Sequence, residues 1–197
     1  MQQRSEATHR QILEAARQQF ALAGYDATGV SEICAAAGIS KGAFYHHFPS
    51  KQQVFLDLLE EWIAGLESEV KRAMEAEGSI PDRLLHMAAL IKGVFDIADG
   101  RLPLFLEFWR QASKDPQVWR ASIEPYRRFE HLFIQLVERG KQEGTIRPLD
   151  SDTVARSILA LAIGMLLQGI LDPQSARWDE TTVQGIGFLI DGIRRKE

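Results

Sequence analysis

The side chains best suited to chemistry in this chain gather in one short segment, residues 41–47. The segment contains a lysine, a tyrosine and two adjacent histidines. Around it, the chain from Ile33 to Leu56 contains no aspartate or glutamate. DNA is a dense line of negative charge, so an acid in a DNA-binding segment would be repelled. The composition of this stretch therefore indicates contact with nucleic acid, and the simpler alternative is the solvated polar face of a structural helix.

Two short helices joined by a tight turn are predicted to carry this segment. Thr28 and Gly29 can cap a helix over about residues 30–37, and Gly38 suits the left-handed residue at its end. Ser40 can cap the second helix. A small apolar core is available from five residues: Ile33, Ala37, Ile39, Phe44 and Phe48. This arrangement is a helix-turn-helix, which places its second helix in the major groove of DNA.

The motifs in this region are those of a known family. G-Y-D-A-T, then I-x-x-A-A-G-I-S-K-G-A-F-Y-H-H-F and then P-S-K resemble the DNA-binding domain of the TetR family of bacterial transcriptional regulators. The resemblance extends from about Glu6 to Leu66. It implies a DNA-binding domain at residues 6–66, with the helix-turn-helix at about 29–48, and a helical ligand-binding and dimerisation domain at residues 67–197.

The resemblance also implies which residues contact DNA. It assigns six residues to the major groove and its edges: Lys41, Gly42, Ala43, Tyr45, His46 and His47. It assigns phosphate contacts to Ser40, to Lys51 and to the backbone of Thr28 and Gly29. The family commonly has serine or threonine where Gly29 stands, so one side-chain phosphate contact is expected to be missing. The second helix also lacks arginine, asparagine and glutamine, the best bidentate readers of bases. We therefore expect few direct base contacts and a large contribution from phosphates and DNA shape.

Most of the remaining chain also has helical patterns, and no strand is predicted. Besides the two short helices, we expect helices over about residues 5–23, 50–75, 81–98, 103–113, 115–140, 152–171 and 179–195. Turn residues separate these segments, as at Gly78–Pro81 and Asp172–Pro173. The expected fold class is all-α, with an N-terminal three-helix DNA-binding domain and a larger C-terminal helical domain.

The last two helices are more apolar than surface helices need to be. Residues 153–171 are apolar on every side, and such a helix must be covered on every side. Either it is the buried central helix of a monomer, or one face meets the core and another meets a second subunit. We favour the homodimer, which the resemblance also implies, because TetR-family members dimerise through their last two helices. A charge at Leu166 or Ile190 is predicted to disrupt this interface.

Clustered aromatic residues in the C-terminal part offer walls for a ligand. Ordinary core packing explains most of them, but some can line an apolar cavity. The candidate ligand-binding residues are Trp62, Phe95, Phe105, Phe108, Trp109, Phe129, Phe133 and Met165. An apolar, flat or elongated effector fits these walls best. A cation would be favoured by the aromatic faces and by Glu107, whereas an anion would require Arg110 to face inward.

The sequence contains no motif for catalysis, a metal or a cofactor, so none of these is expected. G-x-S-x-G, a phosphate-cradling glycine loop and H-E-x-x-H are all missing, and His86 and His131 lack a second ligand at helical spacing. The single cysteine, Cys34, cannot form an internal disulfide, and the N-terminus is unlike a signal peptide, which together indicate a cytoplasmic protein without a membrane segment. A net charge of −4 excludes a chain that is basic throughout.

The combined expectation is a ligand-responsive transcriptional regulator. Family analogy favours a repressor that binds a palindromic operator as a homodimer and that a small, mainly apolar molecule releases. One alternative is an α-helical small-molecule or protein-binding module without DNA-binding activity. Another is a helical enzyme whose site cannot be read from the sequence. DNA mobility shifts would separate the first two hypotheses, and turnover of a bound molecule would point to the third.

Overall fold

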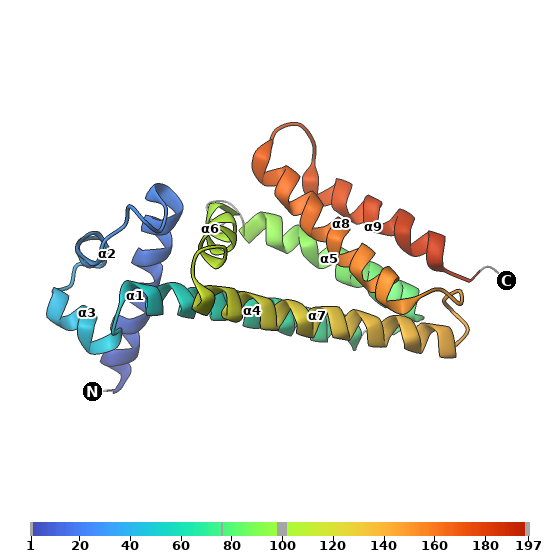
Figure 1. Cartoon of the computed structure of the whole chain (residues 1–197), viewed down its shortest axis with the longest axis horizontal. Helices are drawn as coiled ribbons and strands as arrows, with labels where there is room; N and C mark the ends of the chain where they lie inside the picture. The colour runs from blue at the N-terminus through green and yellow to red at the C-terminus, as the bar shows by residue number, and fades with distance from the viewer. Residues whose placement is uncertain (1, 76, 98–101, 196–197) are drawn as a thin grey trace. The chain divides into compact units, whose positions relative to one another are not determined.

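The structure is a computed structural model that describes residues 2–75, 77–97 and 102–195, with side chains described outside residues 2–4 and 91–105. The described residues are helical almost throughout (Figure 1). In chain order the helices are α1 (Gln2–Ala23), α2 (Val30–Ala37), α3 (Lys41–His47), α4 (Lys51–Met74), α5 (Ile80–Ile97), α6 (Leu102–Ala112), α7 (Pro116–Gln142), α8 (Ser151–Leu171) and α9 (Trp178–Ile193). The all-α prediction is confirmed, and each helix begins and ends within a few residues of its predicted bounds.

The chain divides into two compact units. The first unit contains Met1–Ala64 and Asp99–Ile123, and the second contains Gly65–Ala98 and Glu124–Glu197. Helices α4 and α7 therefore contribute residues to both units. Helix α6 belongs to the first unit, where it packs against α1. This division differs from the boundary expected at residues 66 and 67, which placed α6 with the C-terminal helices.

The first unit is held together by an aromatic core. The largest fully buried rings in it are Phe20, Phe44, Phe48 and Phe55. Phe108 of α6 joins this core, with its ring centroid 4.4 Å from that of Phe55. Burying each such side chain contributes about 1.5–3 kcal/mol to stability. The core therefore fixes the short helices α2 and α3, which have too few residues to be stable alone.

The turn between α2 and α3 has the predicted chemistry. Gly38 ends α2 with φ 63° and ψ 34°, a left-handed conformation in which glycine avoids the strain of a side chain. Ser40 begins α3, and its hydroxyl oxygen accepts a hydrogen bond from the Ala43 amide at 3.1 Å. These two local features orient α3 relative to α2 and leave one face of α3 outside the core.

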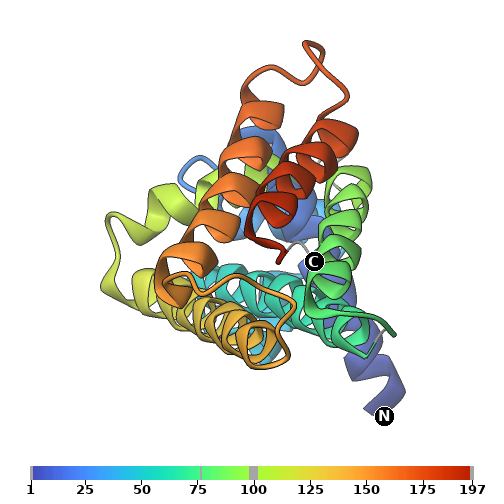
Figure 2. The same cartoon turned by 90° about the vertical axis from the view of Figure 1, so that its right-hand side faces the viewer.

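In the second unit, α9 packs against both α5 and α8 (Figure 2). The core of this unit is mainly aliphatic, and its largest fully buried side chains are Ile80, Leu84, Val137, Ile146 and Ile190. The loop after α7 pairs with the end of α9 through an isolated antiparallel bridge between Ile146 and Arg194. Among the described residues this bridge is the only β-type pairing.

Helix α8 is only partly covered within one chain. By length and composition it is long and apolar enough to cross a membrane, yet only 28% of its apolar window is buried. At its end Leu171 is 72% exposed, and Phe188 on the neighbouring α9 is 78% exposed. A helix buried in the centre of a monomer would be covered on all sides. Helix α8 is therefore not the buried central helix of a monomer.

Candidate nucleic-acid interface and effector residues

Helix α3 presents the residues assigned to DNA on its outer side. Lys41, Gly42, Tyr45 and His46 are exposed, whereas Phe44 between them is fully buried. Ala43 and His47, also assigned to the groove, are half-buried. The face therefore carries an ammonium, a phenol and imidazoles that can meet phosphates and base edges.

The N-terminus of α2 is capped by the Glu32 side chain from the first turn of the same helix. The Gly29 amide donates a hydrogen bond to Glu32 Oε2 at 3.0 Å. A Cβ added to Gly29 would lie 2.5 Å from the same oxygen, so a serine there would require the Glu32 carboxylate to move. The expected phosphate contact at this backbone position thus competes with an internal carboxylate.

The loop between α1 and α2 is fastened by Thr28 and Lys51. The Thr28 side chain is 1% exposed, and its hydroxyl lies 3.1 Å from the Gln19 carbonyl and 2.9 Å from the Gly24 carbonyl. The Lys51 ammonium donates to the carbonyls of Tyr25 at 2.7 Å and Thr28 at 2.8 Å. It also lies 4.1 Å from the centre of the Tyr25 ring. Burial lowers the pKa of Lys51. The resemblance did not indicate this structural role.

Removing the Lys51 side chain should therefore lower stability as well as DNA affinity. Hydrogen bonds to charged groups contribute about 1.5–3 kcal/mol, so we expect Lys51→Ala to lower the melting temperature by several degrees. Lys41→Ala is the matched variant, because Lys41 is exposed on α3. It should leave the melting temperature unchanged and reduce the salt dependence of DNA binding by about 0.9 for each phosphate that the lysine neutralises. If Lys51→Ala instead flattens the salt dependence at an unchanged melting temperature, Lys51 holds a phosphate and not the loop.

A charged network fastens the same loop to α6. Arg110 donates to Glu107 at 2.6 and 3.0 Å and to Asp26 at 2.9 Å. The Gln111 amide donates to Glu107 at 2.9 Å and to Asp26 at 3.1 Å. Lys114 lies 3.5 Å from Asp26. Asp26 and Arg110 are 84 positions apart, so no local sequence pattern could have connected them.

The network keeps both of its carboxylates ionised. Hydrogen bonds from Arg110 and Gln111 lower the pKa of Asp26 to about 2. Glu107 is 8% exposed, and burial alone would raise its pKa. Hydrogen bonds from the same two side chains outweigh that effect and hold the Glu107 pKa below its ordinary value. Glu107 is thus already paired with a cation, and Arg110 with two anions, so neither is left to orient a small ligand as the sequence suggested.

The effector candidates are distributed over both units. In the first, Phe108 is buried, Trp109 is 52% exposed and Trp62 packs against the aromatic core. In the second, Phe133 is buried while Phe129 and Met165 are half-buried. The side chains of Phe95 and Phe105 lie outside the described residues.

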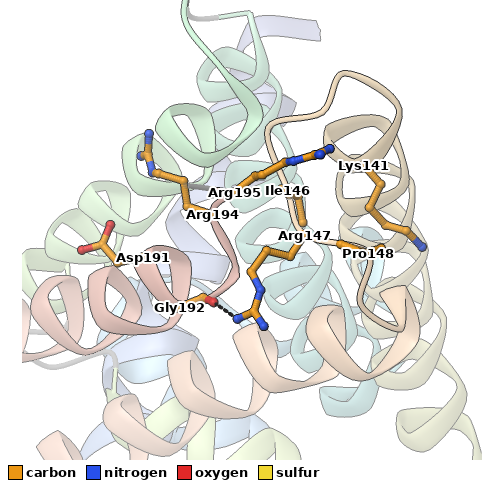
Figure 3. Close-up of a pocket in the computed structure, with 8 residues that line it drawn as sticks. All are labelled: Lys141, Ile146, Arg147, Pro148, Asp191, Gly192, Arg194 and Arg195. Atoms are coloured by element: carbon orange, nitrogen blue, oxygen red, sulfur yellow. Dashed lines mark hydrogen bonds between the residues drawn. The ribbon is translucent and has the colours of Figure 1, made fainter. Parts of the chain in front are cut away.

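A pocket of about 650 Å3 lies in the second unit, and none of the candidates with described side chains lines it. It is lined by Lys141, Ile146, Arg147, Pro148, Asp191, Gly192, Arg194 and Arg195 (Figure 3). Arg147 donates to the Gly192 carbonyl at 2.9 Å, and Arg194 donates to Asp82 at 2.8 Å. The side chains of Arg194 and Lys141 point away from each other. The pocket therefore has a wall of mixed polar and apolar character, unlike the aromatic effector site expected from the sequence.

The cysteine and the metal-ligating residue types add no further site. Cys34 is buried, and burial raises the pKa of its thiol, so it packs as a small apolar residue. In the part of the chain that the structure describes, no three histidine, cysteine, aspartate or glutamate residues are grouped so that they could hold a metal ion.

Comparison with known sequences identifies the family. The chain matches the profile described as "Bacterial regulatory proteins, tetR family" over residues 12–58. It also matches the profile described as "BetI-type transcriptional repressor, C-terminal" over residues 86–186, just over half of its length. The chain belongs to the TetR family.

Two relatives illustrate the similarity along the whole chain. The HTH-type transcriptional regulator UidR of Escherichia coli K12 is 25% identical over 194 residues, which are 98% of this chain and 96% of UidR. The HTH-type transcriptional repressor DhaR of Mycobacterium sp. strain GP1 is 29% identical over 161 residues, 80% of this chain and 79% of DhaR. The prediction of a TetR-family DNA-binding transcriptional regulator with a ligand-binding C-terminal domain is confirmed.

Solved structures show the same TetR fold. A transcriptional regulator from Saccharomonospora viridis in complex with choline has a TM-score of 0.86 and 21% identity, covering 97% of this chain and all of that one. The fatty acid degradation regulator FadR of Bacillus halodurans has a TM-score of 0.81 and 22% identity, covering 96% of this chain and 97% of FadR. At these identities the structures establish the fold.

Proposed function

We propose that this TetR-family regulator is a cytoplasmic repressor that binds a palindromic operator as a homodimer and dissociates when a small, mainly apolar molecule binds. The observation that carries the proposal is the outer face of α3, where Lys41, Tyr45 and His46 are exposed. No acid occurs from Ile33 to Leu56, so this face can approach phosphates without repulsion. In the groove and at its edges we place Lys41, Gly42, Ala43, Tyr45, His46 and His47.

The uncovered apolar surface of α8 and α9 supports a homodimer. Phe188 and Leu171 are largely exposed, and Ile163, Leu167 and Ile170 on α8 are only partly buried. A two-fold interface brings the same patch of each protomer together, so a self-complementary apolar surface suits it. The two-fold symmetry of such a dimer would match a palindromic operator.

Coupling between effector and DNA would run through α7, which carries Phe129 and Phe133 and begins in the first unit, and through α6, which directly precedes it. Arg110, Glu107 and Gln111 on α6 hold the loop that contains Asp26, and this loop leads directly into α2. A movement of α6 would therefore alter the position of α2 and of α3 behind it. An effector can drive this movement only if it binds the two positions with different affinities.

The second unit supplies the best-supported effector residues. Phe129 and Met165 are half-buried and Phe133 is buried there, which suits an apolar wall. The choline complex of the Saccharomonospora regulator makes choline the first compound to test. Aromatic faces attract quaternary ammonium groups, so choline is compatible with the predicted apolar or cationic effector.

The proposal is tested by selecting an operator from random duplex DNA and titrating the complex with choline, other cationic amphiphiles, apolar compounds and anionic metabolites. Members of the first three classes are expected to quench emission from the four tryptophans and to release DNA at the same concentrations. Phe129→Ala should weaken release about tenfold or more at unchanged DNA affinity, whereas Tyr126→Ala, exposed on the same helix, should not.

Two results would contradict the proposal. If selection yields no preferred duplex, the chain is a helical binding module without operator binding. If only anionic metabolites release the DNA, the apolar effector residues are wrong while the DNA-binding function stands.

A further inference from the structure

Three of the five histidines of the chain meet in the first unit, on the side that carries α3. The His9 ring of α1 stacks on Phe48, with centroids 4.5 Å apart and planes at 24°. The edge of His47 faces His9 at 6.2 Å between centroids, and His46 lies 5.2 Å from His47. Two helices distant in sequence thus bring imidazoles together beside the residues assigned to DNA.

We propose that His47 takes up a proton when α3 binds DNA, and that His9 is a positioning residue whose ring, held beside His47 by stacking on Phe48, opposes that protonation in the free protein. The inference rests on the proposed contact between α3 and DNA. His9 itself need not touch DNA, because it acts through the ring of His47.

The surroundings of the cluster are simple. His46 from α3 and His9 from α1 face His47. From α4, Asp57 Oδ2 lies 3.8 Å from His9 Nε2, and the other Asp57 oxygen accepts a hydrogen bond from Gln53 at 2.7 Å. The acid of α2, Glu32, is bonded to the Gly29 amide. Besides burial, the imidazoles of His46 and His9 are therefore the groups that disfavour a proton on His47.

The pKa of His47 follows from this arrangement. Burial lowers it below the ordinary value of 6.5, and the neighbouring His46 and His9 lower it further. His47 is therefore neutral in the free protein near pH 7.5. Phosphates close to α3 would favour the charged form and raise its pKa in the complex.

The sign of the pH effect is fixed by these two shifts. Between the lowered pKa of free His47 and its higher pKa on DNA, the complex holds more protons than the separated components. Binding must then strengthen as pH falls through this window. One unit of pKa difference corresponds to up to about a tenfold change in binding constant per protomer, so we expect operator affinity to rise about tenfold or more from pH 7.5 to 6.

The test compares operator affinity from pH 8 to 6 in the wild type and in His9→Phe. Phenylalanine preserves the stacking on Phe48 but cannot bind a proton. It should preserve binding at pH 8. The rise in affinity should begin at a higher pH than in the wild type, because His47 then accepts its proton more easily. A side-chain NMR titration of free His47 should show the same upward shift, and His9→Gln serves if His9→Phe folds poorly. His86→Gln/His131→Gln removes the two other histidines, both exposed in the second unit, and should leave the profile unchanged.

The inference is overturned if wild-type affinity does not depend on pH in this range, or if the profiles of the His9 variants superimpose on that of the wild type. If the His9 variants lose operator affinity equally at every pH, the role of His9 is purely structural. Absence of operator binding at any pH would instead count against the proposed function. The NMR titration of free His47 would still decide whether His9 lowers its pKa.

Discussion

Replacing Phe188 with glutamate should convert the proposed homodimer into monomers and weaken operator binding by about 100-fold or more, because linked binding sites lose this order of avidity when separated. Phe188 is 78% exposed in the single chain, so the substitution should leave the fold of each protomer intact. At a two-fold interface each complex would bury two glutamates in apolar contact, at a cost of several kcal/mol. Light scattering after gel filtration measures the mass, and circular dichroism measures the melting temperature.

Leu22→Glu is the matched control for this experiment. Leu22 is 83% exposed on α1 in the first unit, so the variant removes an equally exposed apolar side chain and adds the same charge. It should remain dimeric. A dimeric Phe188→Glu protein with wild-type operator affinity would place the subunit interface elsewhere than at this part of α9.

Helical periodicity could not show which apolar residues of α8 and α9 face a second subunit. The sequence offered Leu166 and Ile190 as interface residues, but both are buried within the chain, and Ile190 belongs to the core of the second unit. A charge at either position would unfold the protomer and would not report on assembly. Apolar residues on all sides of a helix predict that the helix is covered, but they cannot distinguish which residues the same chain covers and which a second chain covers.

Local patterns did predict most of the fold. The bounds of α2 and α3 follow from Gly29, Gly38 and Ser40, because caps and left-handed glycines act within a few residues. Part of the aromatic core was also predicted, because Phe44 and Phe48 were expected in the apolar core of the two short helices. These features depend on neighbours in sequence, so the sequence contains what is needed to predict them.

Long-range polar contacts could not be predicted from the sequence. The resemblance assigned Lys51 to phosphate, but its ammonium donates to the carbonyls of Tyr25 and Thr28. Likewise Glu107 and Arg110 were considered for a ligand, while the structure pairs them with each other and ties Arg110 to Asp26. No sequence pattern shows which backbone carbonyl a lysine will contact. Helical periodicity likewise cannot pair two residues that are 84 positions apart. The fold brings them together, so only the structure shows which donors are already used.

The second large effect is expected on the α3 face itself. Lys41→Glu should weaken operator binding about 100-fold or more at physiological salt, because it removes a phosphate contact and adds a repelling charge in both protomers. Lys41 is exposed at the start of α3, so the fold should be unaffected. In the dimer the slope of log affinity against log salt should fall by about two units, roughly 0.9 for the phosphate that each protomer no longer neutralises. Mobility shifts at several salt concentrations measure both quantities.

Lys71→Glu separates this local effect from the change in overall charge. Lys71 is exposed on α4 in the second unit, and its substitution changes the net charge by the same amount as Lys41→Glu. It should reduce operator affinity only slightly, since exposed charges more than about 8–10 Å from the DNA are largely screened at physiological salt. Equal losses in the two variants would mean that the protein responds to its total charge. That result would contradict the assignment of α3 as the DNA-contact helix, because Lys41 would then contribute no more to operator affinity than Lys71.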